Sequence, residues 1–398
     1  MSTLAAPDWE TEVHRPEPPL TAEGLLRRRA RQKPETLALS DPPNTDMLGL
    51  GRPRSFVYGE ADAAVDALAS FFVEIGLEPG DKIAVQLPNL ALQPLTLLAA
   101  WRAGLCVAVL PMLWRGYEIN KMCEAIEPKA LIGVSSFGGA RPTEELCRVA
   151  APHLFVRFVL GFGQDLPDGV VSLDDAILAR PGVGPLDARQ RKGPALITFT
   201  ARRDMPLIPV YRGEDELLAQ GAMTVLALSL DSRDVILNPY PLTGPAGLAL
   251  ALAPWLISGC VLAQHQPLDY AVFVQQMFAT GATVTALPSP VLEELAKDRV
   301  LEERRCLLRH LGAVRTAFER ALPLSLGTPS PLFDLYPLGD LASIVLSRKA
   351  GSVSSSLPLG PIKVGDDGDG AIFVETRLRR ETVDARVGDL LLRGPVVP

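Results

Sequence analysis

Two kinds of apolar pattern alternate along the first half of the chain. From Ala61 to Ile75 the apolar side chains recur on one face of a helix, and Gly76 follows where that helix would end. Short apolar runs and further helical segments come next, with strands expected at 82–87, 106–110 and 130–134 and helices at 91–102 and 118–126. This alternation predicts a parallel sheet with helices on both faces.

A second alternation of the same kind runs from Ala195 to Leu301. It predicts strands at 195–200, 235–237, 261–263 and 283–286, and helices at 215–228, 247–257 and 270–280. From Ser343 onward the pattern changes to short strands and tight turns. We therefore expect an α/β fold with two parallel-sheet subdomains and flanking helices, residues 1–190 and 191–342, and a small C-terminal β-rich subdomain, residues 343–398.

Two segments allow two interpretations each. Residues 362–374 are two apolar runs around a Gly/Asp-rich turn; the acidic residues suggest a calcium loop, but no glutamate closes it, so we favour a β-hairpin. Residues 244–263 carry no charge over about twenty positions, nominally enough to cross a bilayer. Pro245, Pro254 and many small residues favour a buried helix followed by a strand, so we expect no membrane span.

Composition and charge narrow the class of protein. The chain has 398 residues, 47% of them hydrophobic and 21% charged, which predicts a globular fold. Its net charge of -7 disfavours nucleic-acid binding, and we interpret the basic run 27–31 as the solvated face of a helix. Five cysteines without metal-ligand spacing, and an N-terminus unlike a signal peptide, favour a reduced, cytoplasmic protein. The motifs of serine hydrolases, P-loop NTPases and dinucleotide-binding proteins are missing.

Several segments resemble the motifs of one enzyme family. They read GLEPGDKIA at 76–84, AAWRAG at 99–104, RGYE at 115–118, NPYPLTGPAGL at 238–248 and GDLLLRGP at 388–395. These are similar to G-x-x-P-G-D-x-V-A, A-x-x-R-A-G, G-Y-E-L, L-P-L-F-H-x-x-G-L and G-E-L-x-x-R-G-P of the AMP-forming acyl-CoA synthetases, an adenylate-forming family. The resemblance extends from about Leu25 to Pro398 and implies the large N-terminal domain of such an enzyme.

The resemblance implies a reaction in which a carboxylic acid and ATP form an acyl-AMP that the thiolate of CoA then attacks. ATP, Mg²⁺ and CoA would be the cofactors, and a carboxylic acid or an acyl-CoA would be the small-molecule ligand. The acyl-pocket motif places Thr243, Gly244 and Gly247 at the acyl group, where small residues would leave space. Close packing of a helix explains the same residues equally well.

The family's phosphate-binding loop is altered. In the family it reads about T-S-G-T-T-G-x-P-K-G, with glycine N–H groups and a lysine around the phosphates. Here the strand 195–200 ends at Thr200, which matches, and is followed by ARRDMPL at 201–207, without glycine or lysine. Arg202 and Arg203 offer side-chain charge to a phosphate, or they are part of a solvated turn.

The adenine and metal motifs are also altered. The family's Y-G-x-T-E appears as YPLGD at 336–340, and its glycine-rich adenine strand is reduced to GAVR at 312–315. By resemblance, Tyr336 would stack on adenine and Asp340 would hold Mg²⁺. The alternatives, which we favour, are a core residue for Tyr336 and a helix cap for Asp340.

These changes lead to two hypotheses for function. The first is a divergent large domain of an AMP-dependent ligase, which we expect to be unable to adenylate a carboxylic acid on its own, and to which no catalytic residue is assigned. In the family a ribose-binding aspartate, a hinge and a C-terminal domain with a catalytic lysine would lie beyond Pro398. The alternative is a non-catalytic pseudoenzyme that binds an acyl group, a CoA ester, a protein partner or a second copy of itself.

Overall fold

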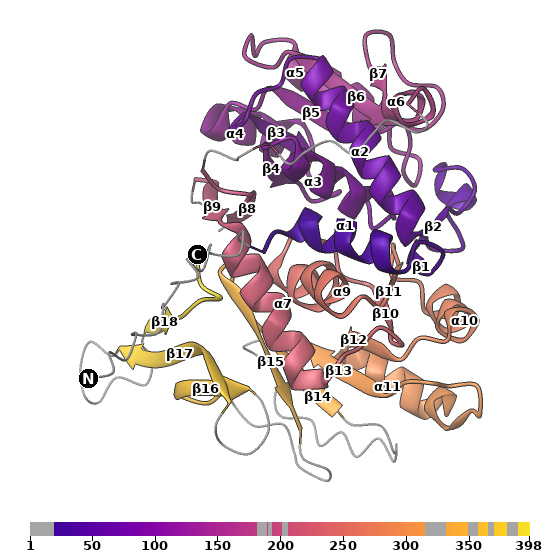
Figure 1. Ribbon diagram of the computed structural model, residues 1–398, viewed down its shortest axis with the longest axis vertical. Helices are drawn as coiled ribbons and strands as arrows, with labels where there is room; N and C mark the ends of the chain where they lie inside the picture. Colours follow the sequence, from indigo (N-terminus) through magenta and orange to yellow (C-terminus); the bar gives the residue numbers. More distant parts are fainter. Residues whose placement is uncertain are drawn as a thin grey trace, which may run out of the picture.

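The computed structural model shows a molecule built on three β-sheets. It describes residues 20–180, 189, 193–200, 206–314, 332–348, 357–364, 370–379 and 389–398. Two large sheets with their helices lie one above the other, and a small third sheet lies beside the lower one (Figure 1). The predicted α/β fold class, with parallel-sheet subdomains and a small antiparallel C-terminal sheet, is confirmed.

The first large sheet has seven strands in the order β7-β6-β5-β3-β4-β8-β9. In chain order its strands are β3 (Lys82–Val85), β4 (Cys106–Val109), β5 (Ala130–Val134), β6 (Phe158–Phe162), β7 (Val171–Ser172), β8 (Leu196–Thr200) and β9 (Ile208–Arg212). Its helices are α2 (Tyr58–Glu74), α3 (Leu92–Arg102), α4 (Gly116–Ile126), α5 (Pro142–Ala150) and α6 (Leu173–Leu178). Neighbouring strands are parallel except β8 and β9, which are antiparallel.

The second large sheet has eight strands in the order β15-β14-β13-β12-β10-β11-β1-β2. They are β1 (Leu37–Ser40), β2 (Ser55–Val57), β10 (Val235–Asn238), β11 (Val261–Gln264), β12 (Val284–Pro288), β13 (His310–Val314), β14 (Leu332–Leu338) and β15 (Ala342–Ser347). Its helical segments are α1 (Ala22–Gln32), η1 (Asp46–Leu48), α7 (Glu214–Leu228), α8 (Pro245–Gly247), η2 (Leu248–Leu252), α9 (Ala253–Ser258), α10 (Tyr270–Thr280), α11 (Ser289–Lys297) and η3 (Val300–Glu302). Parallel pairing runs from β1 to β14, and antiparallel strands β2 and β15 close the two edges.

The chain passes between the two large sheets more than once. The N-terminal strands β1 and β2 join the second sheet, strands β3 to β9 form the first, and strands β10 to β15 belong to the second again. Helix α1 lies between the sheets, close to α2, α3 and α9 (Figure 1). The subdomain boundaries expected at residues 190 and 342 stay a prediction.

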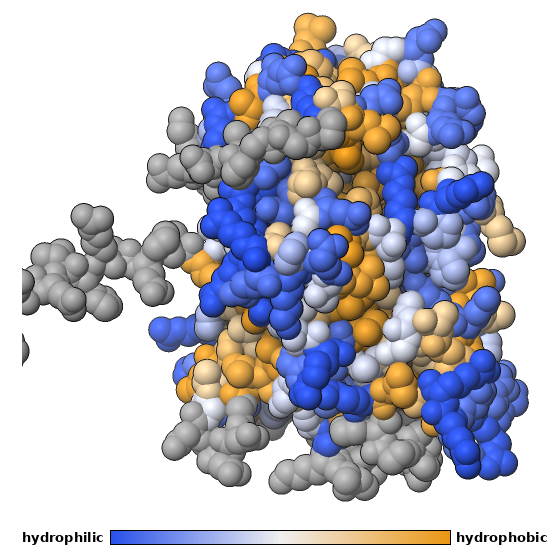
Figure 2. All heavy atoms as spheres, turned by 45° about the vertical axis from the view of Figure 1, so that its right-hand side comes forward, coloured by the Kyte–Doolittle hydropathy of each residue, from blue (hydrophilic) through white to orange (hydrophobic). Residues whose placement is uncertain are grey.

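The third sheet is antiparallel and consists of β16 (Gly360–Val364), β17 (Ala371–Arg379) and β18 (Asp389–Arg393). The pairing of β16 with β17 confirms the β-hairpin predicted for 362–374, although the tip at 365–369 lies outside the described residues. On the face of the molecule in Figure 2, hydrophilic and hydrophobic residues are interspersed.

The uncharged segment 244–263 folds as the predicted buried helix and strand. It forms α8, the π-helical segment η2, α9 and then β11, and Leu248–Leu252 are all buried. The hydroxyl of Thr224 in α7 donates a hydrogen bond to the carbonyl oxygen of Ala249 at 2.8 Å, which satisfies one main-chain group of the π-helical turn. Within the described part of the chain, no helix is both long and apolar enough to cross a membrane.

The interpretation of residues 27–31 as a solvated face is wrong for two of its arginines. Arg27 forms a 2.6 Å ion pair with Asp66, and Arg29 donates a 2.8 Å hydrogen bond to the carbonyl oxygen of Ile257 in α9. Only Arg28 and Arg31 of this run are exposed. Helical periodicity places residues on faces but does not show that a second element covers a charged face.

Candidate functional site

Strands β8 and β9, which flank the altered phosphate-loop segment in the sequence, meet the turn that carries the altered metal motif at one side chain, Arg212. This residue ends β9, the strand that follows the altered phosphate-loop segment, and it is 4% exposed. Its Nη1 donates a 2.7 Å hydrogen bond to the carbonyl oxygen of Leu341, and its Nη2 donates to the carbonyl oxygen of Asp340. Nη2 also lies 3.5 Å from the hydroxyl of Thr198 in β8. One guanidinium therefore joins the first sheet to the β14–β15 turn of the second.

Asp340 lies in the turn between β14 and β15, so the interpretation as a helix cap is wrong. These strands pair in antiparallel register up to Leu338 and Ala342, which leaves only three residues for the turn. The half-buried Asp340 carboxyl group has a raised pKa because burial disfavours its charged form, and the charge of Arg212 partly opposes that shift. The role of Asp340 as a metal ligand stays a prediction.

Of the three residues predicted to bind phosphate, the structure describes only Thr200. Thr200 is the last residue of β8, pairs with Ile208 in β9 and is partly exposed. Arg202 and Arg203 lie outside the described residues. A role for these three residues in phosphate binding stays a prediction.

Tyr336 is 8% exposed in the middle of β14 and belongs to the main hydrophobic cluster. The interpretation as a core residue is therefore confirmed. The neighbouring strand β13 carries Gly312, and a Cβ atom there would overlap the ring of Phe333. The space beside this glycine is thus filled by an aromatic side chain of the same protein, which explains the glycine by close packing.

The predicted acyl-pocket residues differ in their surroundings. A Cβ atom on Gly247 would overlap the carbonyl oxygen of Pro241, so Gly247 is explained by close packing. A Cβ atom on Gly244 would meet nothing within 4 Å, and Thr243 beside it is partly exposed. Gly244 is therefore a position of this motif where the structure leaves open space.

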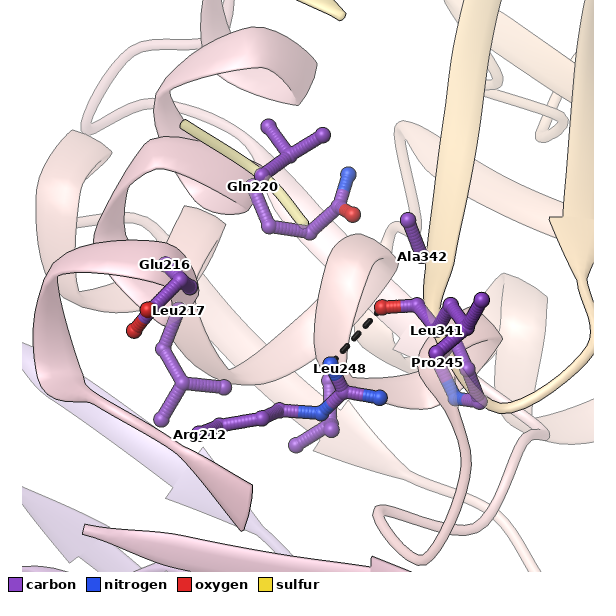
Figure 3. Close-up of a pocket in the computed structure, with 9 residues that line it drawn as sticks. Arg212, Glu216, Leu217, Gln220, Pro245, Leu248, Leu341 and Ala342 are labelled. Atoms are coloured by element: carbon purple, nitrogen blue, oxygen red, sulfur yellow. Dashed lines mark hydrogen bonds between the residues drawn. The ribbon is translucent and has the colours of Figure 1, made fainter. Parts of the chain in front are cut away.

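A small pocket lies beside Arg212 (Figure 3). Helix α7 contributes Glu216, Leu217 and Gln220, and Pro245, Leu248, Ala342 and Val396 complete the lining with Leu341. Its volume of about 10 Å³ is the size of one water site. It is too small for a nucleotide or an acyl group.

Gln220 fixes the start of β15 from the other side of this pocket. Its side-chain amide donates to the carbonyl oxygen of Ser343 at 2.5 Å and accepts from the N–H of Ser343 at 3.0 Å. Gln220 and Ser343 are both buried. The turn that carries Asp340 is therefore held by Arg212 at its tip and by Gln220 at its base.

The charge of Arg212 is only partly compensated. Burial lowers the pKa of Arg212 to about 10, and the nearby carboxylates of Asp340 and Glu216 oppose that shift. The Nε atom of Arg212 and the Oε2 atom of Glu216 are buried without a hydrogen-bond partner. Perturbed charges with unsatisfied polar atoms are typical of functional sites. Sequence reasoning missed Arg212, whose only signal was its position after the altered loop.

Comparisons with known proteins show which family this chain resembles. Residues 26–200 match the family model described as AMP-binding enzyme. The pseudomonine synthase PmsE of Pseudomonas entomophila is 28% identical over 283 residues, which cover 69% of this chain and 43% of that protein. The salicyl-AMP ligase / salicyl-S-ArCP synthetase of Mycobacterium tuberculosis is 26% identical over 347 residues, which cover 82% of this chain and 59% of that protein. The chain thus spans about half the length of these curated relatives.

A solved structure shows the same fold. The anthranilate CoA ligase AuaEII, in complex with anthranoyl-AMP, superposes with a TM-score of 0.76 at 15% sequence identity, over 95% of this chain and 70% of that one. At this identity the likeness concerns the fold alone.

Proposed function

Because this chain belongs to the AMP-binding enzyme family, we propose that it is a divergent large domain of an AMP-dependent ligase that binds a carboxylic acid or an acyl ester but does not form an acyl adenylate on its own. Family membership implies the use of ATP. The inability to adenylate is our inference from the residues of this chain.

The observation that carries the proposal is the segment after β8. Residues 201–207 contain neither the glycines whose N–H groups would wrap the β- and γ-phosphates nor a lysine to neutralise their charge. Phosphoryl and adenylyl transfer depend almost entirely on positioning and charge stabilisation, so losing both should lower the rate by several orders of magnitude.

Two positions away from the loop support the same proposal. Phe333 fills the space beside Gly312 in the strand that resembles the adenine strand, and Arg212 binds the carbonyl oxygens of the turn that resembles the metal motif. Both changes replace space for ligand by contacts within the protein. They favour the alternative hypothesis of a pseudoenzyme that binds an acyl group, a CoA ester, a protein partner or a second copy of itself.

Small aromatic acids are the substrate class that we propose to test first. The relatives include a salicyl-AMP ligase, and the superposed structure holds anthranoyl-AMP. A Cβ atom on Gly244 would meet nothing within 4 Å, and we propose that such an acid binds beside Gly244 and Thr243. ATP, Mg²⁺ and CoA are the cofactors that the family suggests. The five free cysteines agree with the proposed cytoplasmic location.

Thermal unfolding with ligands tests the binding half of the proposal. A ligand at about 100 times its dissociation constant adds about 2.7 kcal/mol to the free energy of unfolding. We expect salicylate, anthranilate or an acyl-CoA to raise the melting temperature, and ATP with Mg²⁺ to leave it unchanged. Gly244→Leu, which fills open space, should abolish the shift by the acid.

Two results would change this account. Stabilisation by ATP with Mg²⁺ and by no acid or ester would contradict the proposed ligand class. Stabilisation by none of these compounds would favour the hypothesis of a protein partner.

A further inference from the structure

The guanidinium of Arg212 lies among three oxygen atoms, which come from strand β8 and from the turn between β14 and β15. The carbonyl oxygens of Asp340 and Leu341 accept hydrogen bonds from its two terminal nitrogens, and the Thr198 hydroxyl lies 3.5 Å from Nη2. Main-chain carbonyl oxygens, hydroxyl groups and carboxylates are the ligands that hard divalent cations prefer. The surroundings of Arg212 are therefore chemically those of a cation site.

Two carboxylates lie near these oxygen atoms and act on Arg212 through their charge. The charges of Asp340 and Glu216 both favour the protonated form of Arg212. Glu216, at the start of α7, turns back over Gly213, where a Cβ atom would lie 2.5 Å from its Oε2. That Oε2 is buried without a hydrogen-bond partner, although it lines the same pocket as Arg212 (Figure 3). A buried carboxylate oxygen in this state favours a positive charge close by.

Magnesium does not fit this arrangement. The resemblance suggests Asp340 as its ligand, but the guanidinium of Arg212 already occupies the position next to the Asp340 turn and is nearly fully buried. A second cation at Asp340 would be repelled at short range in a poorly solvated environment. In the described part of the chain, no group of three or more His, Cys, Asp or Glu residues could hold a metal ion elsewhere.

We propose that Arg212 takes the place of a divalent cation between the Asp340 turn and α7, so that this chain binds no divalent metal ion at Asp340. The guanidinium supplies the positive charge and also the hydrogen bonds that hold β14 and β15 against β8. This inference concerns the folded chain itself and does not depend on whether the chain adenylates an acid.

Binding of Mn²⁺ tests the proposal without any activity assay. It is measured in electron paramagnetic resonance as the loss of the signal of the free ion. We expect the wild-type chain and Asp340→Asn to bind the same amount of Mn²⁺, because the wild type has no metal site at Asp340. Arg212→Ala vacates the centre of the oxygen cluster, so it should bind Mn²⁺ about tenfold tighter than the wild type or better. The double variant Arg212→Ala/Glu216→Gln should lose this gain.

A matched control is Arg115→Ala. Arg115 also donates to two main-chain carbonyl oxygens, of Met112 and Trp114 at 2.8 and 2.9 Å, but it is exposed. Removing it should create no Mn²⁺ site. Arg212→Ser serves as a second variant if Arg212→Ala does not fold, with folding checked by circular dichroism.

Two results would overturn the proposal. One is Mn²⁺ bound to the wild-type chain and lost in Asp340→Asn, which would show that a metal and Arg212 share the site. The other is a folded Arg212→Ala or Arg212→Ser chain with no gain in Mn²⁺ affinity, which would show that the oxygen cluster is no cation site. If neither variant folds, the wild-type measurement against Asp340→Asn decides.

Discussion

Arg102 and Arg212 are both buried arginines, but their partners differ. Arg102, at the end of α3, is 0% exposed and contacts the carboxylates of Glu23, Asp62 and Asp66 at 3.1, 2.6 and 2.8 Å. Burial alone would lower its pKa, and the three carboxylates outweigh burial and raise it. Arg212 contacts two carbonyl oxygens and a hydroxyl group, and its pKa falls to about 10.

This difference indicates a structural role for Arg102 and a place in the candidate functional site for Arg212. The carboxylates around Arg102 come from α1 and α2, so the ion cluster ties three helices together in the first half of the chain. Arg212 lies where strand β8 meets the turn that resembles the metal motif, and it keeps an unsatisfied Nε atom next to a pocket.

The largest effect that we expect comes from Arg102→Met. It leaves Glu23 without its counter-charge and leaves Arg27 as the one remaining ion-pair partner of Asp62 and Asp66, so the free energy of unfolding should fall by about 3–5 kcal/mol. The midpoint of urea unfolding, followed by circular dichroism, measures the change. Arg28→Met, on the exposed face of the same region, is the control and should change little. If Arg102→Met lost less stability than Arg212→Met, the proposed difference between the two arginines would be wrong.

A smaller effect is expected for Gln220→Met, which removes a neutral contact with the Asp340 turn. The N–H and carbonyl groups of Ser343 would lose their buried partners, so unfolding should become easier by about 1–3 kcal/mol. The same urea experiment measures it. If the variant is as stable as the wild type, the turn is not held at its base by this amide.

Arg212→Met should cost about 1 kcal/mol or less, despite burial similar to that of Arg102. Three hydrogen-bonded contacts are lost, but the unfavourable burial of a charge is relieved at the same time. Urea unfolding of both arginine variants in one buffer gives the comparison directly. Equal losses for Arg102→Met and Arg212→Met would show that Arg212 is fully compensated after all.

The smallest effect concerns pH and Asp340→Asn. The raised pKa of Asp340 means that the folded chain holds this proton more tightly than the unfolded chain, so the contribution of Asp340 to stability is greatest below its ordinary pKa of 3.8 and falls as the pH rises through its folded pKa. Asp340→Asn should therefore be slightly more stable than the wild type at pH 7, by under about 1 kcal/mol. This gain in stability should shrink toward pH 4. If Asp340→Asn were less stable than the wild type at pH 7, the prediction would be wrong.

The sequence predicted the regular elements well because their apolar periods are local. The helix expected at 61–75 forms at Tyr58–Glu74, and the strand expected at 130–134 forms at those residues. Which sheet a strand joins depends on distant parts of the chain, so the sequence pattern did not show that β1 pairs with β11 or that β8 and β9 belong to the first sheet.

The site was harder to predict than the fold. Motif resemblance pointed to Asp340, but its position in a turn depends on the pairing of β14 with β15 and was missed. Arg212 stands 128 residues before Asp340 in the chain, and no local pattern shows that an arginine at a strand end will be buried against a distant turn. Only the structure therefore shows that Arg212 supplies the positive charge at the candidate site.

The most direct test of the central claim is acid-dependent exchange of labelled pyrophosphate into ATP by the wild-type chain. We predict the same background exchange with and without salicylate, anthranilate or a fatty acid, in the presence of Mg²⁺. A variant with a glycine-rich, lysine-containing loop at 200–207 is the matched comparison. Exchange by the wild-type chain that rises and saturates with the concentration of an acid would contradict the claim that it cannot adenylate on its own.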